Sequence, residues 1–160
     1  MAEPATSSNA TAQVIAGQLR LSAGYLSDSR VLAEHKSRSA ANLLFQATEA
    51  ALLAVLTSEG QHAGRANQHQ LGAMKDMLPD ANPMKPLFSE LEHLSGYATT
   101  FRYVTPAGRI KDGLSASELV RLQLKVDQII ETCRDWFGVN LAGNAVSPAT
   151  RITPLRPHSA

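Results

Sequence analysis

The residues most able to do chemistry lie in two short stretches that are well separated in the sequence. The first, residues 65–71, reads Arg-Ala-Asn-Gln-His-Gln-Leu and contains Arg65 and His69. Asn67 is a favourable N-cap, so His69 is predicted to lie in the first turn of a short helix. The free backbone N–H groups at a helix start attract anions such as phosphate. This stretch therefore predicts a phosphate-binding histidine; the alternative is that His69 bonds to a neighbouring helix and fixes the loop.

The second stretch, residues 97–106, places Arg102 and Tyr103 at the predicted exit of a helix, next to a loop with two further basic residues. The forked guanidinium of arginine can hold phosphate oxygens, and a tyrosine ring can stack on a base. The structural alternative is that Arg102 caps the last carbonyls of the helix while Tyr103 covers the end of the bundle. From the residues alone, the ligand-binding and the structural interpretation of each stretch both stay open.

Most signatures of catalysis and of metal binding are absent from the sequence. It contains no glycine-rich phosphate loop, no Gly-x-Ser-x-Gly, no His-Glu-x-x-His and no paired cysteines. The single cysteine, Cys133, falls on an apolar helical stripe and is interpreted as a core residue. None of the five histidines has another histidine four positions away. We therefore expect neither a metal ion nor another cofactor.

Five helices are predicted to position these stretches. Apolar residues recur at helical spacing in each of them, and no run shows the period-two alternation of a strand. The predicted helices cover residues 11–35, 37–58, 67–78, 84–103 and 115–137. The second is apolar on nearly all sides, which is typical of a central helix or of an interface. The sequence therefore predicts an all-α fold, an antiparallel bundle of four long helices plus one short helix.

The length, the charge and the lack of a targeting segment together predict one domain and a cytoplasmic location. With 160 residues, 15 of them Lys or Arg and 14 Asp or Glu, the chain has the length of one domain and no strong global field. Residues 1–10 and the proline-containing tail 139–160 are predicted to be disordered, which leaves residues 11–138 as the helical domain. The sequence shows no secretory signal and no apolar run long enough to span a bilayer, so we expect a cytoplasmic protein without a membrane partner.

Three of the predicted helices together resemble the HEPN domain family. The second predicted helix reads Gln-Ala-Thr-Glu-Ala-Ala-Leu-Leu-Ala-Val-Leu over residues 46–56, Gln-His-Gln-Leu follows at 68–71, and Tyr97 leads into Phe-Arg-Tyr at 101–103. The order and spacing of these motifs, across about residues 11–137, are similar to those of the family.

The resemblance implies a bundle of four to five helices, frequent homodimerisation and a role in binding nucleotides or RNA. By analogy with the family's motifs, His69, Arg102 and Tyr103 match the residues that would bind the ligand. Many members pair with a minimal nucleotidyltransferase as toxin and antitoxin, so the resemblance also implies such a partner.

The sequence departs from the ribonuclease members of this family. Those members carry an arginine, a polar residue and then a histidine, with four to six residues between the arginine and the histidine. Here Arg65 and His69 have only three residues between them, and the apolar Ala66 follows the arginine. We therefore predict a HEPN-like domain that binds a nucleotide, RNA or a protein partner without catalysis of its own. The alternatives are a metal-independent ribonuclease, with His69 and Arg65 as its catalytic residues, and a dimeric scaffold that binds no ligand.

A homodimer is expected on physical grounds as well. The second predicted helix has more apolar surface than one face of a small bundle covers, and we expect the excess to bury against a second copy with two-fold symmetry. A basic cleft in the dimer would favour the two ligand-binding hypotheses, whereas a neutral, wholly apolar seam would favour the scaffold.

Overall fold

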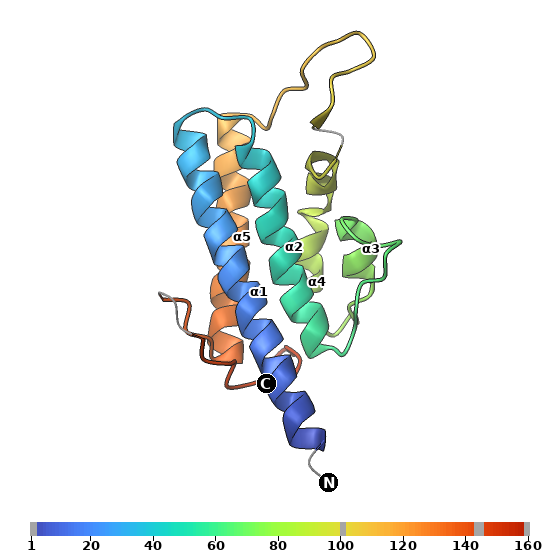
Figure 1. Ribbon diagram of the computed structural model, residues 1–160, viewed down its shortest axis with the longest axis vertical. Helices are drawn as coiled ribbons and strands as arrows, with labels where there is room; N and C mark the ends of the chain where they lie inside the picture. Colours follow the sequence, from blue (N-terminus) through green and yellow to red (C-terminus); the bar gives the residue numbers. More distant parts are fainter. Residues whose placement is uncertain (1–2, 100–101, 143–145, 159–160) are drawn as a thin grey trace.

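The computed structural model of the chain describes residues 3–99, 102–142 and 146–158. Within these residues, three long helices lie side by side in Figure 1, of which α1 (Glu3–Glu34) runs upward and α2 (Ala40–Ser58) and α5 (Ala116–Phe137) run downward. Three short elements lie beside α2: α3 (Leu71–Asp76), α4 (Lys85–Ser89) and the 3-10 helix η1 (Glu92–Tyr97). The described residues contain no strand, so the predicted all-α fold is confirmed.

The predicted fourth long helix, over residues 84–103, is wrong, because two short elements, α4 and η1, occupy this region. Groups in η1 bond to other elements. The Ser95 hydroxyl accepts the backbone N–H of Leu71 at 2.9 Å, and the side-chain amide of Asn42 donates to the Tyr97 carbonyl at 2.7 Å. These hydrogen bonds from α2 and α3 hold the segment as a tight 3-10 turn in place of a continuous α-helix.

Two further predicted boundaries differ from the structure. α1 begins at Glu3 and so extends into residues 1–10, for which the sequence predicts disorder. α3 begins at Leu71. Asn67, the predicted N-cap, instead belongs to a turn in which its carbonyl accepts the N–H of Gln70 at 3.1 Å. His69, within this turn, has a left-handed φ of 65°, and a right-handed helix cannot continue through that conformation.

The contact between α1 and α2 is the most extensive in the fold. α2 contributes small residues such as Ala47 and Ala51, which are fully buried. Two buried serines of α1 reach the α2 backbone: the Ser22 hydroxyl donates to the Ala47 carbonyl at 2.6 Å, and the Ser29 hydroxyl donates to the Ala40 carbonyl at 2.8 Å. Because alanine and serine side chains are small, the two helix backbones can approach closely enough for these bonds.

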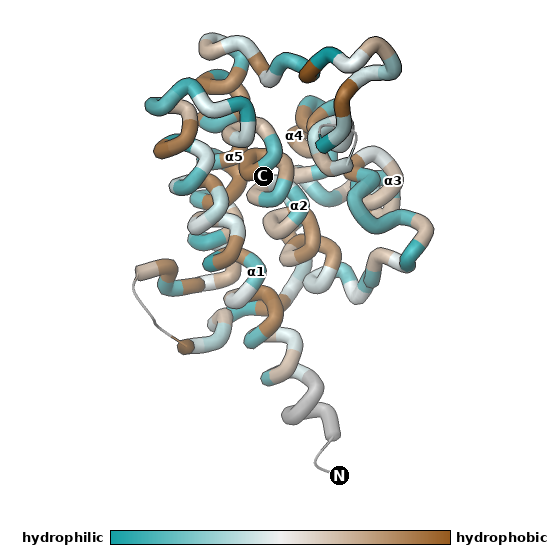
Figure 2. Tube along the Cα trace, turned by 45° about the horizontal axis from the view of Figure 1, so that its top comes forward, coloured by the Kyte–Doolittle hydropathy of each residue, from teal (hydrophilic) through white to brown (hydrophobic). Residues whose placement is uncertain are grey.

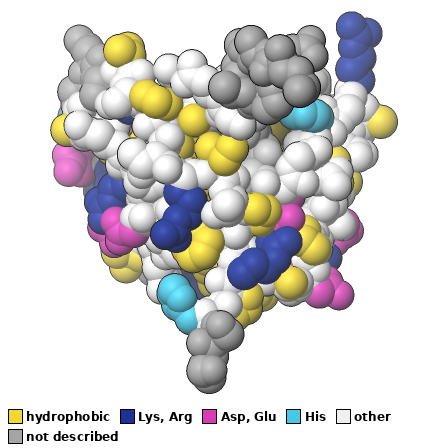
Figure 3. All heavy atoms as spheres, turned by 90° about the horizontal axis from the view of Figure 1, so that it is seen from below, with side chains coloured by type: hydrophobic (Ala, Val, Ile, Leu, Met, Phe, Trp, Pro, Cys, Tyr) yellow, Lys and Arg dark blue, Asp and Glu magenta, His cyan; other side chains and the backbone are white. Residues whose placement is uncertain are grey.

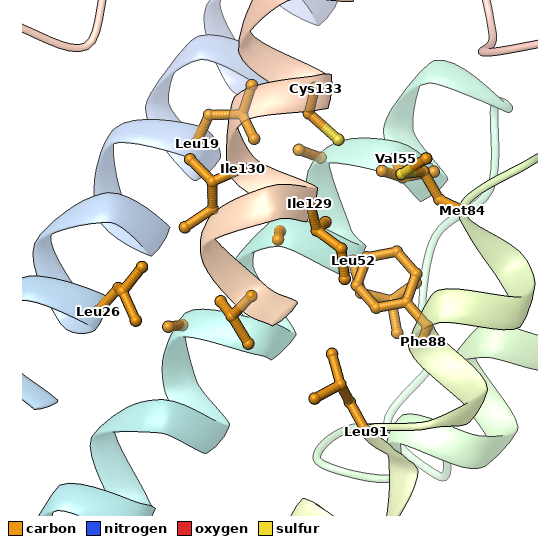
Figure 4. Close-up of a cluster of buried hydrophobic side chains, with 14 of the residues drawn as sticks. Leu19, Leu26, Leu52, Val55, Met84, Phe88, Leu91, Ile129, Ile130 and Cys133 are labelled. Atoms are coloured by element: carbon orange, nitrogen blue, oxygen red, sulfur yellow. The ribbon is translucent and has the colours of Figure 1, made fainter. Parts of the chain in front are cut away.

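Branched and aromatic side chains fill the space between the long helices and α4. The buried residues labelled in Figure 4 come from four parts of the chain, and they are Leu19, Leu26, Leu52, Val55, Met84, Phe88, Leu91, Ile129, Ile130 and Cys133. Burial raises the pKa of the Cys133 thiol to about 12. Cys133 is therefore a core residue, as predicted, and is not a thiolate at neutral pH.

The sequence predicts a disordered tail over residues 139–160, of which 143–145 and 159–160 lie outside the described residues, whereas described residues of this segment pack against the bundle. We call residues 146–158 the C-terminal strap, since they pack across the lower end of the bundle. The Ala149 N–H donates to the Ala12 carbonyl of α1 at 3.0 Å. The Leu155 side chain is buried, with 2% of its surface exposed. The prolines of this segment therefore belong to an extended, packed chain, for which their fixed φ is suited.

An ion pair fastens the strap to the end of α2. Arg156 donates to both carboxylate oxygens of Glu59, with an Nη2–Oε2 distance of 3.1 Å. The side-chain amide of Asn82 also donates to this carboxylate at 3.1 Å. The hydrogen bond from Arg156 lowers the pKa of Glu59 below its ordinary value of 4.5, and the bond from Asn82 acts in the same direction against the effect of burial.

Gly138 joins α5 to the chain that leads into the strap, in a conformation that other residues rarely adopt. Its φ is 62°, in the left-handed region, and its N–H bonds to the Arg134 carbonyl as the C-cap of α5. A Cβ atom at this position would lie 1.8 Å from the Oγ1 atom of Thr150. Both the backbone angle and the contact with the strap therefore require glycine.

α2 is the one helix in the described part of the chain that is long and apolar enough to cross a membrane by length and composition. In the bundle, 67% of its apolar window is buried. Every residue of α2 is buried or half-buried within the single chain. The bundle itself thus covers the apolar surface from which we predict a dimer, and the dimer stays a prediction.

Replacing two glycines with alanine should shift the stability in opposite directions. Gly138→Ala places a side chain in a left-handed conformation and against Thr150, so we expect a loss of about 1–3 kcal/mol. Gly24 lies inside α1 and a Cβ there meets nothing within 4 Å, so Gly24→Ala should gain about 0.5–1 kcal/mol. Urea unfolding followed by circular dichroism measures both. Equal stability of Gly138→Ala and the parent would contradict the packing of the strap.

The Glu59–Arg156 pair predicts a stability contribution that depends on pH. Because the pKa of Glu59 is lowered in the folded state, its contribution is present above about pH 4.5 and is lost as the pH falls through the folded-state pKa. Glu59→Gln should therefore lower the Tm at pH 7, and its difference from the parent should shrink in acid. Glu131→Gln, an exposed site on α5, serves as the control and should differ little at any pH. A difference for Glu59→Gln that stays constant down to about pH 3 would show that the pair does not form.

Candidate functional site

His69 lies in the loop before α3, so its predicted place in the first turn of a helix is wrong. Its φ is 65°, which is uncommon for a residue other than glycine. Its Nδ1 atom lies 2.9 Å from Oε2 of Glu49 on α2, and the Phe45 ring is tilted toward the imidazole with the centroids 6.3 Å apart. The His69 side chain is 55% exposed, whereas that of Glu49 is 18% exposed. The contact with Glu49 agrees with the structural alternative for His69, in which the side chain bonds to a neighbouring helix and fixes the loop.

A small hollow of about 230 Å³ adjoins the His69–Glu49 pair. A carboxylate that bonds one ring nitrogen of a histidine fixes the orientation of the ring, as in hydrolytic dyads. Cleavage of a phosphodiester also needs a cation beside the reacting group. Arg65 is exposed, and among the described residues it forms no hydrogen bond or ion pair with His69.

Arg102 and Tyr103 lie beyond η1, at the start of the loop that crosses the top of the bundle. Both are exposed. The end of η1 is tied to Asn42, which precedes Glu49 by about 10 Å along the axis of α2. Figure 1 shows the loop of residues 102–114 above the bundle, higher in the view than α3. In the described part of the chain no hydrogen bond, ion pair or ring contact joins Arg102 or Tyr103 to His69, whose partners are Glu49 and Phe45, so no such interaction links the three predicted site residues.

The loop of residues 102–114 has an ordered turn at its tip. The Thr105 N–H donates to the Arg109 carbonyl at 2.8 Å, and the Gly108 N–H donates to the Thr105 carbonyl at 2.8 Å. Gly108 has a φ of 77°, which this tight turn requires. Hydrophobic positions interrupt the hydrophilic ones along this loop in Figure 2, and its exposed large apolar residues are Tyr103, Val104 and Ile110.

The base of this loop rests on the turn between α1 and α2. Arg38 donates its Nε–H to the Lys111 carbonyl at 3.2 Å. A Cβ atom on Gly113 would lie 3.4 Å from the Arg38 backbone, so the two segments are in close contact. Lys36, in the same turn, has a left-handed φ of 57°. The fold therefore brings the cations Lys36, Arg38 and Lys111 to one end of the bundle.

A cavity of about 530 Å³ lies between this turn, the loop and the start of α5. Its lining includes Lys36, Arg38 and Lys111, and Asp112 is its one acidic residue among those described. α5 has 22 residues and starts beside the cavity at Ala116, so its dipole adds positive potential there. The remaining lining is largely apolar. We call this end of the bundle the basic end and count in it also the two loop arginines, Arg102 and Arg109.

Lys36 and Arg38 line this cavity but are not among the candidate residues that the sequence motifs predict. They fall at the junction of two predicted helices, where His35, Lys36 and Arg38 make a short basic cluster. This basic cluster is the feature of the sequence that could have identified the two residues. Its convergence with Lys111, which lies far along the chain, depends on the contact of the loop with the turn.

Within the residues that the structure describes, no group of three or more His, Cys, Asp or Glu side chains is placed to hold a metal ion. Comparisons with models of protein families, with curated proteins and with solved structures found no match. The HEPN resemblance therefore stays an expectation from the sequence motifs.

Proposed function

We propose that this protein binds a phosphate-bearing ligand, RNA or a nucleotide, at its basic end and catalyses no reaction there. The observation that carries the proposal is the cavity of about 530 Å³ with three cations, Lys36, Arg38 and Lys111, in its lining. Cations held near one another repel, and a bound polyanion relieves this repulsion. Among the described residues, Lys36 and Lys111 form no ion pair within the chain, so their charges are available to a ligand.

Two residues singled out by the sequence suit the edge of this site. Arg102 and Tyr103 are exposed in the same loop that carries Lys111. An arginine fork binds phosphate through two parallel hydrogen bonds, and a tyrosine ring supplies a stacking surface for a base. The HEPN resemblance, which implies nucleotide or RNA binding, agrees with this ligand class. His69 lies elsewhere and has no role in the proposed site.

A second candidate function, RNA cleavage, is favoured by one observation, the bond between Glu49 and the imidazole of His69. A histidine oriented in this way can act as a general base toward a ribose 2′-hydroxyl. The developing charge on the phosphorane also needs a stabilising cation. Since the described residues show no hydrogen bond or ion pair between Arg65 and His69, we favour binding without cleavage.

Removing the two lysines of the cavity should weaken RNA binding. We expect Lys36→Gln/Lys111→Gln to raise the Kd for a short, fluorescent, single-stranded RNA by about tenfold or more, because a hydrogen bond to a charged group contributes roughly 1.5–3 kcal/mol. Fluorescence anisotropy measures the Kd. The control, Lys85→Gln/Arg134→Gln, removes the same charge from side chains outside the cavity that are already ion-paired.

The control should bind like the parent. An equal loss of affinity in both double variants would show a general effect of charge. Absence of RNA and nucleotide binding by the parent would contradict the proposal itself.

Purified protein should leave both structured and single-stranded RNA intact without added metal. The reason is that the described residues lining the hollow beside His69 include no Lys or Arg. Gel electrophoresis after incubation tests this, with His69→Ala prepared in parallel. Cleavage by the parent that is lost in His69→Ala would establish the ribonuclease in place of the binding protein. Equal cleavage by both would identify a contaminating nuclease.

A further inference from the structure

A second cavity, of about 520 Å³, lies under the C-terminal strap at the lower end of the bundle. Its walls come from the strap, from the last turns of α5 and from the start of α4. Figure 3 views the molecule from below and shows Lys and Arg side chains with hydrophobic side chains between them on this face. We propose that this cavity binds a small organic monoanion, a carboxylate with an aromatic or aliphatic body. The inference is independent of the function proposed for the basic end.

One wall of the cavity is a stacked pair, Arg151 on Trp136. The Arg151 guanidinium carbon lies 4.4 Å from the centre of the indole ring. The indole N–H donates to the Thr153 carbonyl at 2.8 Å, and the backbone N–H of Arg151 donates to the Phe137 carbonyl at 3.1 Å. Both residues are thus held by bonds between α5 and the strap. A guanidinium stacked on a ring keeps its N–H groups free at its edge, where they can bind a carboxylate.

Another part of the wall is fixed by a polar network. Arg156 of the strap pairs with Glu59, and Glu59 accepts the amide of Asn82 at 3.1 Å. The Asn82 side chain, which is fully buried, accepts the Met84 N–H at 2.9 Å. The network joins the end of α2, the segment before α4 and the strap. The cavity is therefore formed before a ligand arrives, which lowers the entropic cost of binding.

Among the described residues around the cavity, one cation forms no ion pair. Arg156 is neutralised by Glu59, and Asp135 pairs with Arg134 at 3.0 Å. In the part of the chain that the structure describes, Arg151 has no acidic partner. The cavity therefore carries one uncompensated positive charge, which selects a ligand with one negative charge.

The rest of the lining selects an apolar body for that ligand. The buried side chains of Met84 and Leu155 lie along the cavity, and Trp136 adds an aromatic surface. The His158 ring is tilted toward that indole with the centroids 6.4 Å apart. A volume of about 520 Å³ fits a small molecule and excludes a folded partner. A carboxylate on an aromatic or aliphatic body matches both the charge and the surface.

The test uses three probes with related skeletons: phenylacetate, phenylacetamide and phenethylamine. Trp136 is the only tryptophan, so a change in its fluorescence reports binding in this cavity, and calorimetry gives an independent Kd. We expect saturable binding of phenylacetate, with the neutral amide and the cationic amine at least about tenfold weaker, since each lacks the charge-assisted bond to arginine. Binding of the amide as tight as that of the carboxylate, or no saturable binding of phenylacetate, would overturn the proposal without the use of any variant.

Variants then locate the site. Arg151→Gln should weaken phenylacetate binding by about tenfold or more and leave the weak binding of the amide unchanged. Arg65→Gln, which removes an equal charge from an exposed loop, should bind phenylacetate like the parent. Unchanged binding by Arg151→Gln, or weakened binding by Lys36→Gln/Lys111→Gln at the basic end, would overturn the assignment to this cavity. Circular dichroism and the Tm check that each variant is folded.

Discussion

The rest of the structure depends on the close packing of α1 on α2. The hydroxyls of Ser22 and Ser29 donate to backbone carbonyls of α2 inside the core, and small residues such as Ala47 leave room for this approach. Larger side chains at these positions would separate the helices and leave buried polar groups without partners. The same pair of helices positions two charged residues. At one end of the pair lies the turn that contains Lys36, and at the other end lies Glu59.

The buried polar side chains that the structure describes all form hydrogen bonds. A ligand can therefore gain the most binding free energy from the exposed, unpaired charges at the two ends of the bundle. Among the described residues, no buried side-chain nitrogen or oxygen lacks a hydrogen-bond partner. At the basic end, Lys36 and Lys111 line a cavity in which, among the described residues, basic side chains outnumber acidic ones. At the lower end, Arg151 forms no ion pair with any residue that the structure describes. The two ends therefore differ in charge density, which favours a polyanion at one and a monoanion at the other.

Local signals in the sequence are sufficient for α5 but not for the features that depend on distant partners. The Ser115 hydroxyl accepts the N–H of Glu118 and Gly138 ends the helix in a left-handed conformation, and serine and glycine are the residue types favoured at these two positions. The break at η1 depends on bonds to α2 and α3, and the order of the strap depends on Arg156 meeting Glu59, ninety-seven residues earlier. The candidate site follows the same rule: Lys36 and Lys111 lie far apart in the sequence, and the cavity that they line requires the tertiary contact between the loop and the α1–α2 turn.

The most direct test of the central claim, ligand binding at the basic end, is a map of backbone amide chemical shifts during titration of isotope-labelled protein with short single-stranded RNA. The account predicts that the shift changes saturate and cluster in residues 35–39 and 102–116, with little change around His69. Shift changes centred on residues 61–70 and Glu49, or the absence of any saturable change, would contradict it.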